Sequence, residues 1–142
     1  MKTMNAQNAE NKNEYLLIFR GTDWSKNLSA EEMQNVASQW MAWFKRLSEE
    51  GKVLGGNPLD HEGKVVSGKN GRTISDGPFA ESKEAIGGYF LLRVDTMDEA
   101  VAIAQQCPGL PHGAKVEVRH IMERCAVSGE PVPKIELATT NA

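Results

Sequence analysis

The hydrophobic residues follow first a strand pattern and then a helical pattern in the N-terminal third of the chain. Residues 15–19 (YLLIF) are apolar at successive positions and too few for a helix, which is typical of a central strand covered on both faces. Ser29-Ala30-Glu31-Glu32 has the form of a capping box, and Gly51 has the position of a helix stop. Between them the apolar residues recur at helical spacing: Met33, Val36, Ala37, Trp40, Trp43, Phe44 and Leu47. The pattern predicts a strand followed by a long amphipathic helix whose aromatic residues lie in the core.

Strand and turn signals dominate the middle of the chain. Val53-Leu54 predicts the start of a second strand, which we expect residues 55–58 (GGNP) to interrupt. Residues 64–67 and 72–75 flank Gly68-Lys69-Asn70-Gly71, in which Asn-Gly is a strong hairpin signal. We therefore expect a β-hairpin inserted after the second strand.

The remaining elements are a strand, a helix and a last strand. Residues 86–95 predict a third main strand, and Thr96-Met97-Asp98-Glu99 has the form of a second capping box. Pro108 is expected to end the helix, and residues 114–122 alternate as a strand. The expected apolar face of this helix comprises Met97, Ala100, Val101, Ala104 and Cys107.

With the hairpin set aside, the predicted order is β-α-β-β-α-β, the order of a ferredoxin-like α+β fold with both helices on one sheet face. Residues 15–19 and 89–94 carry apolar side chains on both faces of their strands, and the chain has no further layer for the second face. An uncovered apolar face is typical of an association surface. We therefore expect a homodimer, with two sheets packed as a dimeric α+β barrel around a cavity.

The composition is that of one globular domain. The 142 residues are 40% hydrophobic and 25% charged, and we expect a domain over residues 14–126 between tails at 1–13 and 127–142. The 16 Lys and Arg residues against 19 Asp and Glu residues leave no basic excess for nucleic acid or an anionic membrane surface. Neither a signal-peptide pattern nor a bilayer-spanning apolar run is present in the sequence, which favours a cytoplasmic protein.

The histidines and cysteines are too scattered to predict a metal site. They are His61, His112, His120, Cys107 and Cys125. None shows metal-ligand spacing, so we expect two free, buried thiols and neither a metal nor another cofactor. The pairs Gly55-Gly56 and Gly87-Gly88 match no phosphate-binding loop. They indicate bulges or close backbone approach, with a backbone-lined ligand wall as the alternative.

A set of ordered motifs resembles one protein family. The longest is residues 76–84 (DGPFAESKE), followed by Gly87-Gly88-Tyr89. The others are Gly55-Gly56, Asp98-Glu99-Ala100, Cys107-Pro108 and Val116-Glu117-Val118-Arg119. Over residues 14–122 the chain resembles the DGPF type of the YCII-related family. The resemblance implies a dimeric α+β barrel. In that family, DGPF members often lie beside genes of extracytoplasmic-function sigma factors, and other branches resemble small lyases and isomerases of ring compounds.

One departure from the family affects the expected chemistry. Smaller YCII-related proteins carry a His in the first helix and an Asp near its end, a pair proposed for acid–base catalysis. Counting back from Gly51, the corresponding positions hold Trp40 and Glu49. Since an indole does not exchange a proton, that mechanism does not carry over to this chain.

Asp76 and His112 are the candidate catalytic residues. Asp76, with Gly77 and Pro78, either forms a turn or serves as a general base or ligand anchor at the mouth of the barrel. His112 lies in a Pro-Gly loop that could cap a pocket, and its alternative is a packed or surface histidine.

The candidate ligand-binding residues lie on two strands. If the apolar residues of the last strand face the helices, Glu117 and Arg119 face the cavity between the sheets, where Arg suits a carboxylate or phosphate. The alternative is an ion pair of Glu117 with Arg119 or Arg93. Tyr89 and Arg93, on the third main strand, complete the set, and we expect Asp76 and Arg119 to share one ligand site.

Two functional hypotheses follow. The first is a cofactor-independent protein that binds a small organic, anionic ligand between its sheets, with lyase or isomerase acid–base activity as its catalytic form. The second is a non-catalytic regulatory or interaction dimer linked to an extracytoplasmic-function sigma factor. A closed polar pocket with converging titratable groups favours the first, and an exposed apolar outer patch favours the second.

Overall fold

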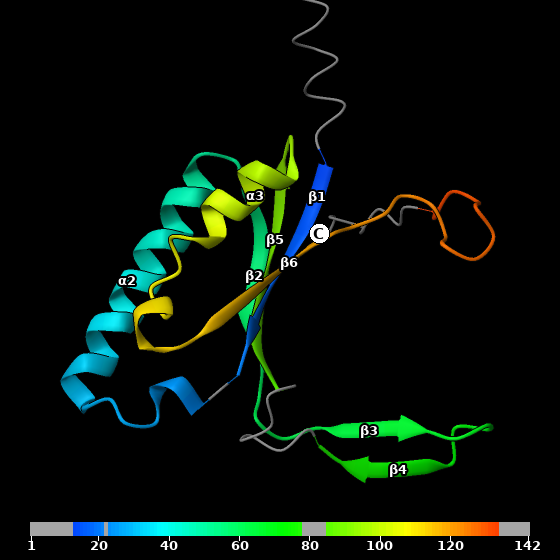
Figure 1. Cartoon of the computed structure of the whole chain (residues 1–142), viewed down its shortest axis with the longest axis horizontal. Coiled ribbons are helices and arrows are strands. Elements are labelled where there is room, and N and C mark those ends of the chain that lie inside the picture. Colours follow the sequence, from blue (N-terminus) through cyan, green and yellow to red (C-terminus); the bar gives the residue numbers. More distant parts are fainter. Residues whose placement is uncertain (1–12, 22, 78–84, 134–142) are drawn as a thin grey trace, which may run out of the picture.

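A four-stranded antiparallel sheet carries two helices on one face, and a separate hairpin extends from one end of it (Figure 1). The computed structural model describes residues 13–21, 23–77 and 85–133. The strands of the sheet are β1 (Asn13–Arg20), β2 (Val53–Pro58), β5 (Ile86–Val94) and β6 (Lys115–His120). The helices are α2 (Ala30–Glu49) and α3 (Met97–Ala104), with short 3-10 turns at η1 (Asp23–Ser25) and η2 (Leu110–His112). The hairpin consists of β3 (Lys64–Ser67) and β4 (Thr73–Asp76).

The order of these elements confirms the predicted α+β class. Without the hairpin the chain reads β1-α2-β2-β5-α3-β6, and the strands lie in the spatial order β2-β5-β1-β6. Each neighbouring pair is antiparallel, which is consistent with a ferredoxin-like fold. Both helices lie on the same face of the sheet, as the sequence predicts (Figure 1).

Local sequence signals explain where α2 begins and ends. The Ser29 hydroxyl accepts a hydrogen bond from the Glu32 backbone N–H at 3.1 Å, and the Ser29 N–H donates to the Glu32 carboxylate at 2.8 Å. This reciprocal pair is the predicted capping box. Gly51 follows the helix with a φ of +73°, a conformation that glycine adopts without strain.

The hydrophobic core lies between the sheet and the helices. Its buried members are Tyr15, Leu17, Phe19, Trp43, Leu47, Val53, Phe90, Leu92, Val94, Ala100, Ile103, Ala104 and Cys107. Alternate residues of β1 and β5 supply most of the sheet side, because successive side chains of a strand point to opposite faces. The partly buried Trp40, Phe44, Val116 and Val118 pack against this cluster.

Two details of the second strand and second helix correct the sequence predictions. Gly55-Gly56-Asn57-Pro58 does not interrupt the second strand, because β2 pairs with β5 as far as Pro58, with one register shift between Val53 and Gly55. The buried face of α3 is Ala100, Ile103 and Ala104, whereas Met97 and Val101 are exposed. The helix ends at Ala104, before Pro108 is reached.

Thr96 caps the start of α3 through one hydrogen bond, which its hydroxyl accepts from the Glu99 backbone N–H. The Glu99 carboxylate bonds the backbone N–H of Asp95, so the reciprocal half of the predicted box is absent at the cap residue. The expectation of two buried thiols holds for Cys107 and is wrong for Cys125. Cys125 is exposed because it lies in a turn beyond the sheet, where its backbone N–H donates to the Glu130 carbonyl at 2.7 Å.

The hairpin forms where the Asn-Gly signal predicts it. Gly68 and Gly71 both have positive φ angles, +91° and +68°, and the Gly71 N–H donates to the Gly68 carbonyl at 3.0 Å. All residues of β3 and β4 are exposed in the single chain. Within the ranges that the structure describes, no helix has the length and apolar character needed to cross a lipid bilayer.

Candidate functional site

The sheet face opposite the helices, here called the open face, carries most of the candidate ligand-binding residues. Val116 and Val118 pack against the core on the helix side, so Glu117 and Arg119 project from the open face of β6. The same alternation places the following residues on the open face of the two central strands: Glu14, Leu16, Ile18, Arg20, Tyr89, Leu91 and Arg93.

The centre of the open face is apolar. Leu16 lies opposite Leu91, and Ile18 lies opposite Tyr89, in the β1–β5 register. All four side chains are half-buried although both helices lie on the other face. Arg93 lies one pair further along, opposite Glu14. The face therefore combines an apolar stripe with charged residues at its sides.

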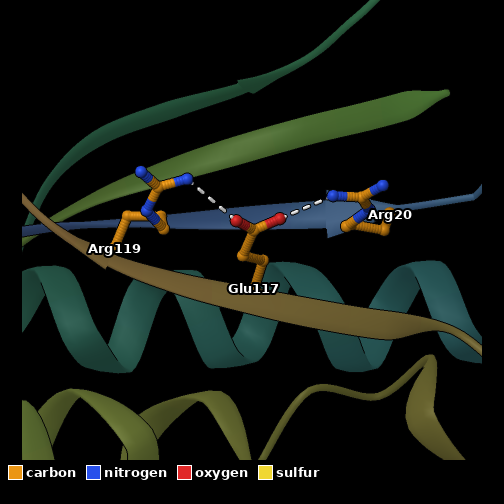
Figure 2. A network of polar contacts seen from close by, with 3 residues as sticks. All are labelled: Arg20, Glu117 and Arg119. Carbon is orange, nitrogen blue, oxygen red and sulfur yellow. Dashed lines mark hydrogen bonds and ion pairs between the residues drawn. The ribbon is translucent and has the colours of Figure 1, made fainter. Parts of the chain in front are cut away.

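A chain of three charged side chains crosses the open face beside this stripe (Figure 2). Arg20 Nη1 contacts Glu117 Oε1 at 2.6 Å, and Arg119 Nη1 contacts the other carboxylate oxygen, Oε2, at 3.1 Å. The hydrogen bonds from Arg20 and then from Arg119 lower the pKa of the Glu117 carboxyl. Glu117 is therefore ionised at neutral pH, and the three residues together carry one net positive charge.

The sequence left open whether Glu117 faces a ligand or forms an ion pair with Arg119 or Arg93. In the structure Glu117 forms an ion pair with Arg119, and its second partner is Arg20 rather than Arg93. The sequence analysis did not select Arg20. The alternation of side chains along a strand could have placed Arg20 on the open face, because Arg20 follows Leu16 and Ile18 at every second position. In the structure its backbone lies opposite Lys115 of β6.

Asp76 lies on the hairpin rather than on the sheet. It ends β4 opposite Lys64 of β3, and the two side chains form an ion pair at the exposed surface. Figure 1 shows the hairpin projecting beyond the end of the sheet. Within one chain, no hydrogen bond or ion pair between the described residues links Asp76 to Arg119. The part of the motif from Pro78 to Glu84 lies outside the described residues.

His112 lies on the helix side of the molecule. Its ring stacks on Trp24 with a centroid distance of 6.3 Å, and Trp24 stacks in turn on Trp40 of α2 at 6.0 Å. Trp40 contacts the core residue Phe19, so this stack lies on the face opposite Arg119. In one chain, His112 and Arg119 thus belong to different surfaces. Within the described ranges, no group of three or more His, Cys, Asp or Glu residues is arranged to hold a metal ion.

One protein-family model matches most of the chain. The model of the YCII-related domain matches residues 14–124, more than three-quarters of the chain. The chain belongs to the YCII-related family. Comparison with curated proteins gives no match. Apart from Asn13, the first residue of β1, the matched range of this YCII-related protein includes the described strands and helices of the sheet and helix layers and the hairpin.

Proposed function

We propose that this YCII-related protein is a homodimer that binds a small organic anion at the open faces of its two sheets. The observation that carries the proposal is the guanidinium of Arg119, held by Glu117 beside an apolar stripe. An anion with an apolar body would place its charge against Arg119 and its body against Leu16 and Leu91.

The electrostatics of the network favour an anion. Arg119 shares its carboxylate partner, Glu117, with a second guanidinium group, so this carboxylate is not reserved for Arg119. Arg119 is the more accessible of the two, with 67% of its side chain exposed, and its Nε and Nη2 atoms make no hydrogen bond within the described residues. A planar fork of this kind binds carboxylate or phosphate oxygens through paired hydrogen bonds.

The apolar stripe supports the dimer. Leu16, Ile18, Tyr89 and Leu91 form the centre of a face that both helices leave uncovered. A second copy of the chain, placed sheet to sheet, would shield these side chains from bulk water. The cavity expected between the two sheets would then hold the anion, with Arg119 at the side of the interface. An apolar centre with a polar rim is the usual arrangement of a protein interface.

The geometry supports binding more strongly than acid–base catalysis. The Asp76 carboxylate is 77% exposed and paired with Lys64, and the Glu117 carboxyl has a lowered pKa because of its two arginine partners. The lowered pKa keeps the Glu117 carboxyl ionised near neutral pH, so Glu117 does not carry the proton that a general acid must donate. Lyase or isomerase activity would require a further group, which Asp76 from the projecting hairpin of the second chain could supply.

The test is isothermal titration calorimetry with benzoate, carried out on the parent protein and two variants. Arg119→Gln should weaken benzoate binding roughly tenfold or more, because a charge-assisted hydrogen bond is lost. Arg46→Gln is the matched control, since Arg46 lies on α2 and bonds Gln106 in the helix layer. Its affinity should equal that of the parent.

Equal benzoate binding by the parent and Arg119→Gln would reject the anion site. A dimer that binds neither benzoate nor inorganic phosphate would also reject it and would favour the non-catalytic regulatory alternative. Raising the salt concentration should weaken binding in the parent, because the guanidinium is exposed and its field is screened.

A further inference from the structure

On the helix side of the sheet, away from Arg119, lies a cavity of about 470 Å³ between α2 and the adjoining ends of β2 and β5. This helix-side cavity is lined chiefly by Phe19, Trp24, Trp40, Phe44, Gly56 and Gly88. Its volume falls within the usual range of small-molecule sites. We infer that it binds a small, neutral, aromatic compound.

Two glycines create the hollow in the sheet. Gly56 lies opposite Phe90 on β5, and Gly88 lies two residues before Phe90, so both belong to the helix-facing side. A Cβ on Gly56 would lie 2.5 Å from the Tyr89 carbonyl oxygen, and one on Gly88 would lie 2.9 Å from the Asn57 carbonyl oxygen. Because neither position accepts a side chain, the sheet surface under α2 is bare backbone there.

Aromatic rings that support one another form the walls. Phe19 meets Trp40 edge-on at 5.1 Å and Phe90 edge-on at 5.0 Å, and Phe44 meets Phe90 at 5.0 Å. Trp24 stacks on Trp40 with an interplanar angle of 16°. Such contacts hold the rings in fixed orientations, so the cavity presents both ring faces and ring edges to a planar guest.

The lining selects against charge. No Asp, Glu, Lys, Arg or His residue is among the described residues that line the cavity. An ion entering it would lose hydration without gaining a counter-charge, which is unfavourable. Met33 and Met41 on α2 line the cavity and are 38% and 68% exposed, so flexible thioether side chains lie at its solvent side.

The experiment uses 2-naphthol as the probe and 2-naphthoate as its charged analogue. The indole N–H signals of the three tryptophans are followed by NMR, each assigned with its Trp→Phe variant. Trp24 and Trp40 line the cavity, whereas Trp43 does not. We expect 2-naphthol to shift the Trp24 and Trp40 signals saturably and more than the Trp43 signal, and 2-naphthoate to leave all three nearly unchanged.

A matched pair of helix variants tests the location. Ala37 and Ala42 are both exposed on α2, but only Ala37 lines the cavity. Ala37→Leu should partly fill it and weaken 2-naphthol binding roughly tenfold, whereas Ala42→Leu should bind like the parent. Leucine is a good helix former, so both variants should fold.

The inference is independent of the anion site, and Arg119→Gln should retain 2-naphthol binding. Absence of saturable binding of 2-naphthol would overturn it. So would equal affinity in Ala37→Leu and the parent, or an equal response of Trp24 and Trp40 to 2-naphthoate.

Discussion

The two cysteines, Cys107 and Cys125, differ in exposure and in the direction in which the pKa of the thiol is shifted. Cys107 is 3% exposed within the core, and burial raises the pKa of its thiol. Cys125 lies in an exposed turn, where hydrogen bonds from the Ser128 backbone and hydroxyl lower the pKa of its thiol. Because the thiolate is the reactive form, both accessibility and ionisation favour reaction at Cys125.

We therefore expect iodoacetamide to modify Cys125 well before Cys107 in the native protein at pH 8. Peptide mass spectrometry over time measures the two rates. In the Cys125→Ser variant, native labelling should be nearly absent and should return in denaturant. Equal rates at the two sites would contradict the burial of Cys107.

Glu117 predicts a pH dependence of stability. Hydrogen bonds from Arg20 and Arg119 lower the pKa of the Glu117 carboxyl in the folded chain. The ionised carboxylate therefore stabilises the folded state relative to the unfolded state. That contribution is fully present above the usual glutamate pKa of about 4.3 and is lost as the pH falls through the folded value. Glu117→Gln should thus lower the melting temperature at pH 7, and the difference should disappear in acid.

The control is Glu62→Gln, which removes an exposed carboxylate that makes no ion pair within the described residues. Its melting temperature should follow that of the parent at every pH. A difference between Glu117→Gln and the parent that persists unchanged at low pH would show that packing, rather than charge, explains the effect.

At the scale of elements, β2 depends on close approach to β5. Gly55 and Gly56 are neighbours in the same strand, yet a Cβ on Gly56 would meet the Tyr89 carbonyl and the Phe90 ring, whereas one on Gly55 would meet nothing within 4 Å. The difference arises because the two positions face opposite sides of the sheet.

Gly56→Ala should consequently destabilise the protein by about 1–3 kcal/mol, as is usual for overpacking against a fixed backbone. Gly55→Ala should change the free energy of unfolding by a few tenths of a kilocalorie per mole at most. Urea denaturation of the two variants measures both values. Comparable losses in both would mean that glycine flexibility, and not steric contact, determines β2.

At the scale of the whole molecule, the proposed homodimer depends on the open face. Light scattering at micromolar concentration should give twice the mass of one chain. Leu16→Lys should yield a folded monomer, because a charge would lie at the centre of the apolar stripe. Val101→Lys is the control: Val101 is an apolar residue too, exposed on α3 in the helix layer and away from the open face.

A monomeric parent protein would reject the dimeric barrel and leave the open face without a partner. If both variants remain dimeric, the dimer exists but is joined through another surface. Circular dichroism of Leu16→Lys separates loss of assembly from loss of folding.

Much of the architecture was predictable because its signals are local. The Ser29 capping box, Gly51 and the Asn70-Gly71 turn act within a few residues, and the alternation of apolar and polar residues over 114–122 assigns side chains to the two faces of the last strand. The family motifs likewise lie in the sequence itself. These features determined the class, the element order and the open-face position of Arg119.

Tertiary structure decided what depends on contacts between distant segments. The continuation of β2 through Pro58 follows from hydrogen bonding to β5, and the pairing of Arg20 with Glu117 joins residues 97 positions apart. The position of Asp76 on a projecting hairpin, apart from Arg119, also depends on how the hairpin leaves the sheet. The helix-side cavity arises only where bare glycine backbone lies under the aromatic residues of α2, and no local pattern contains the distance between them.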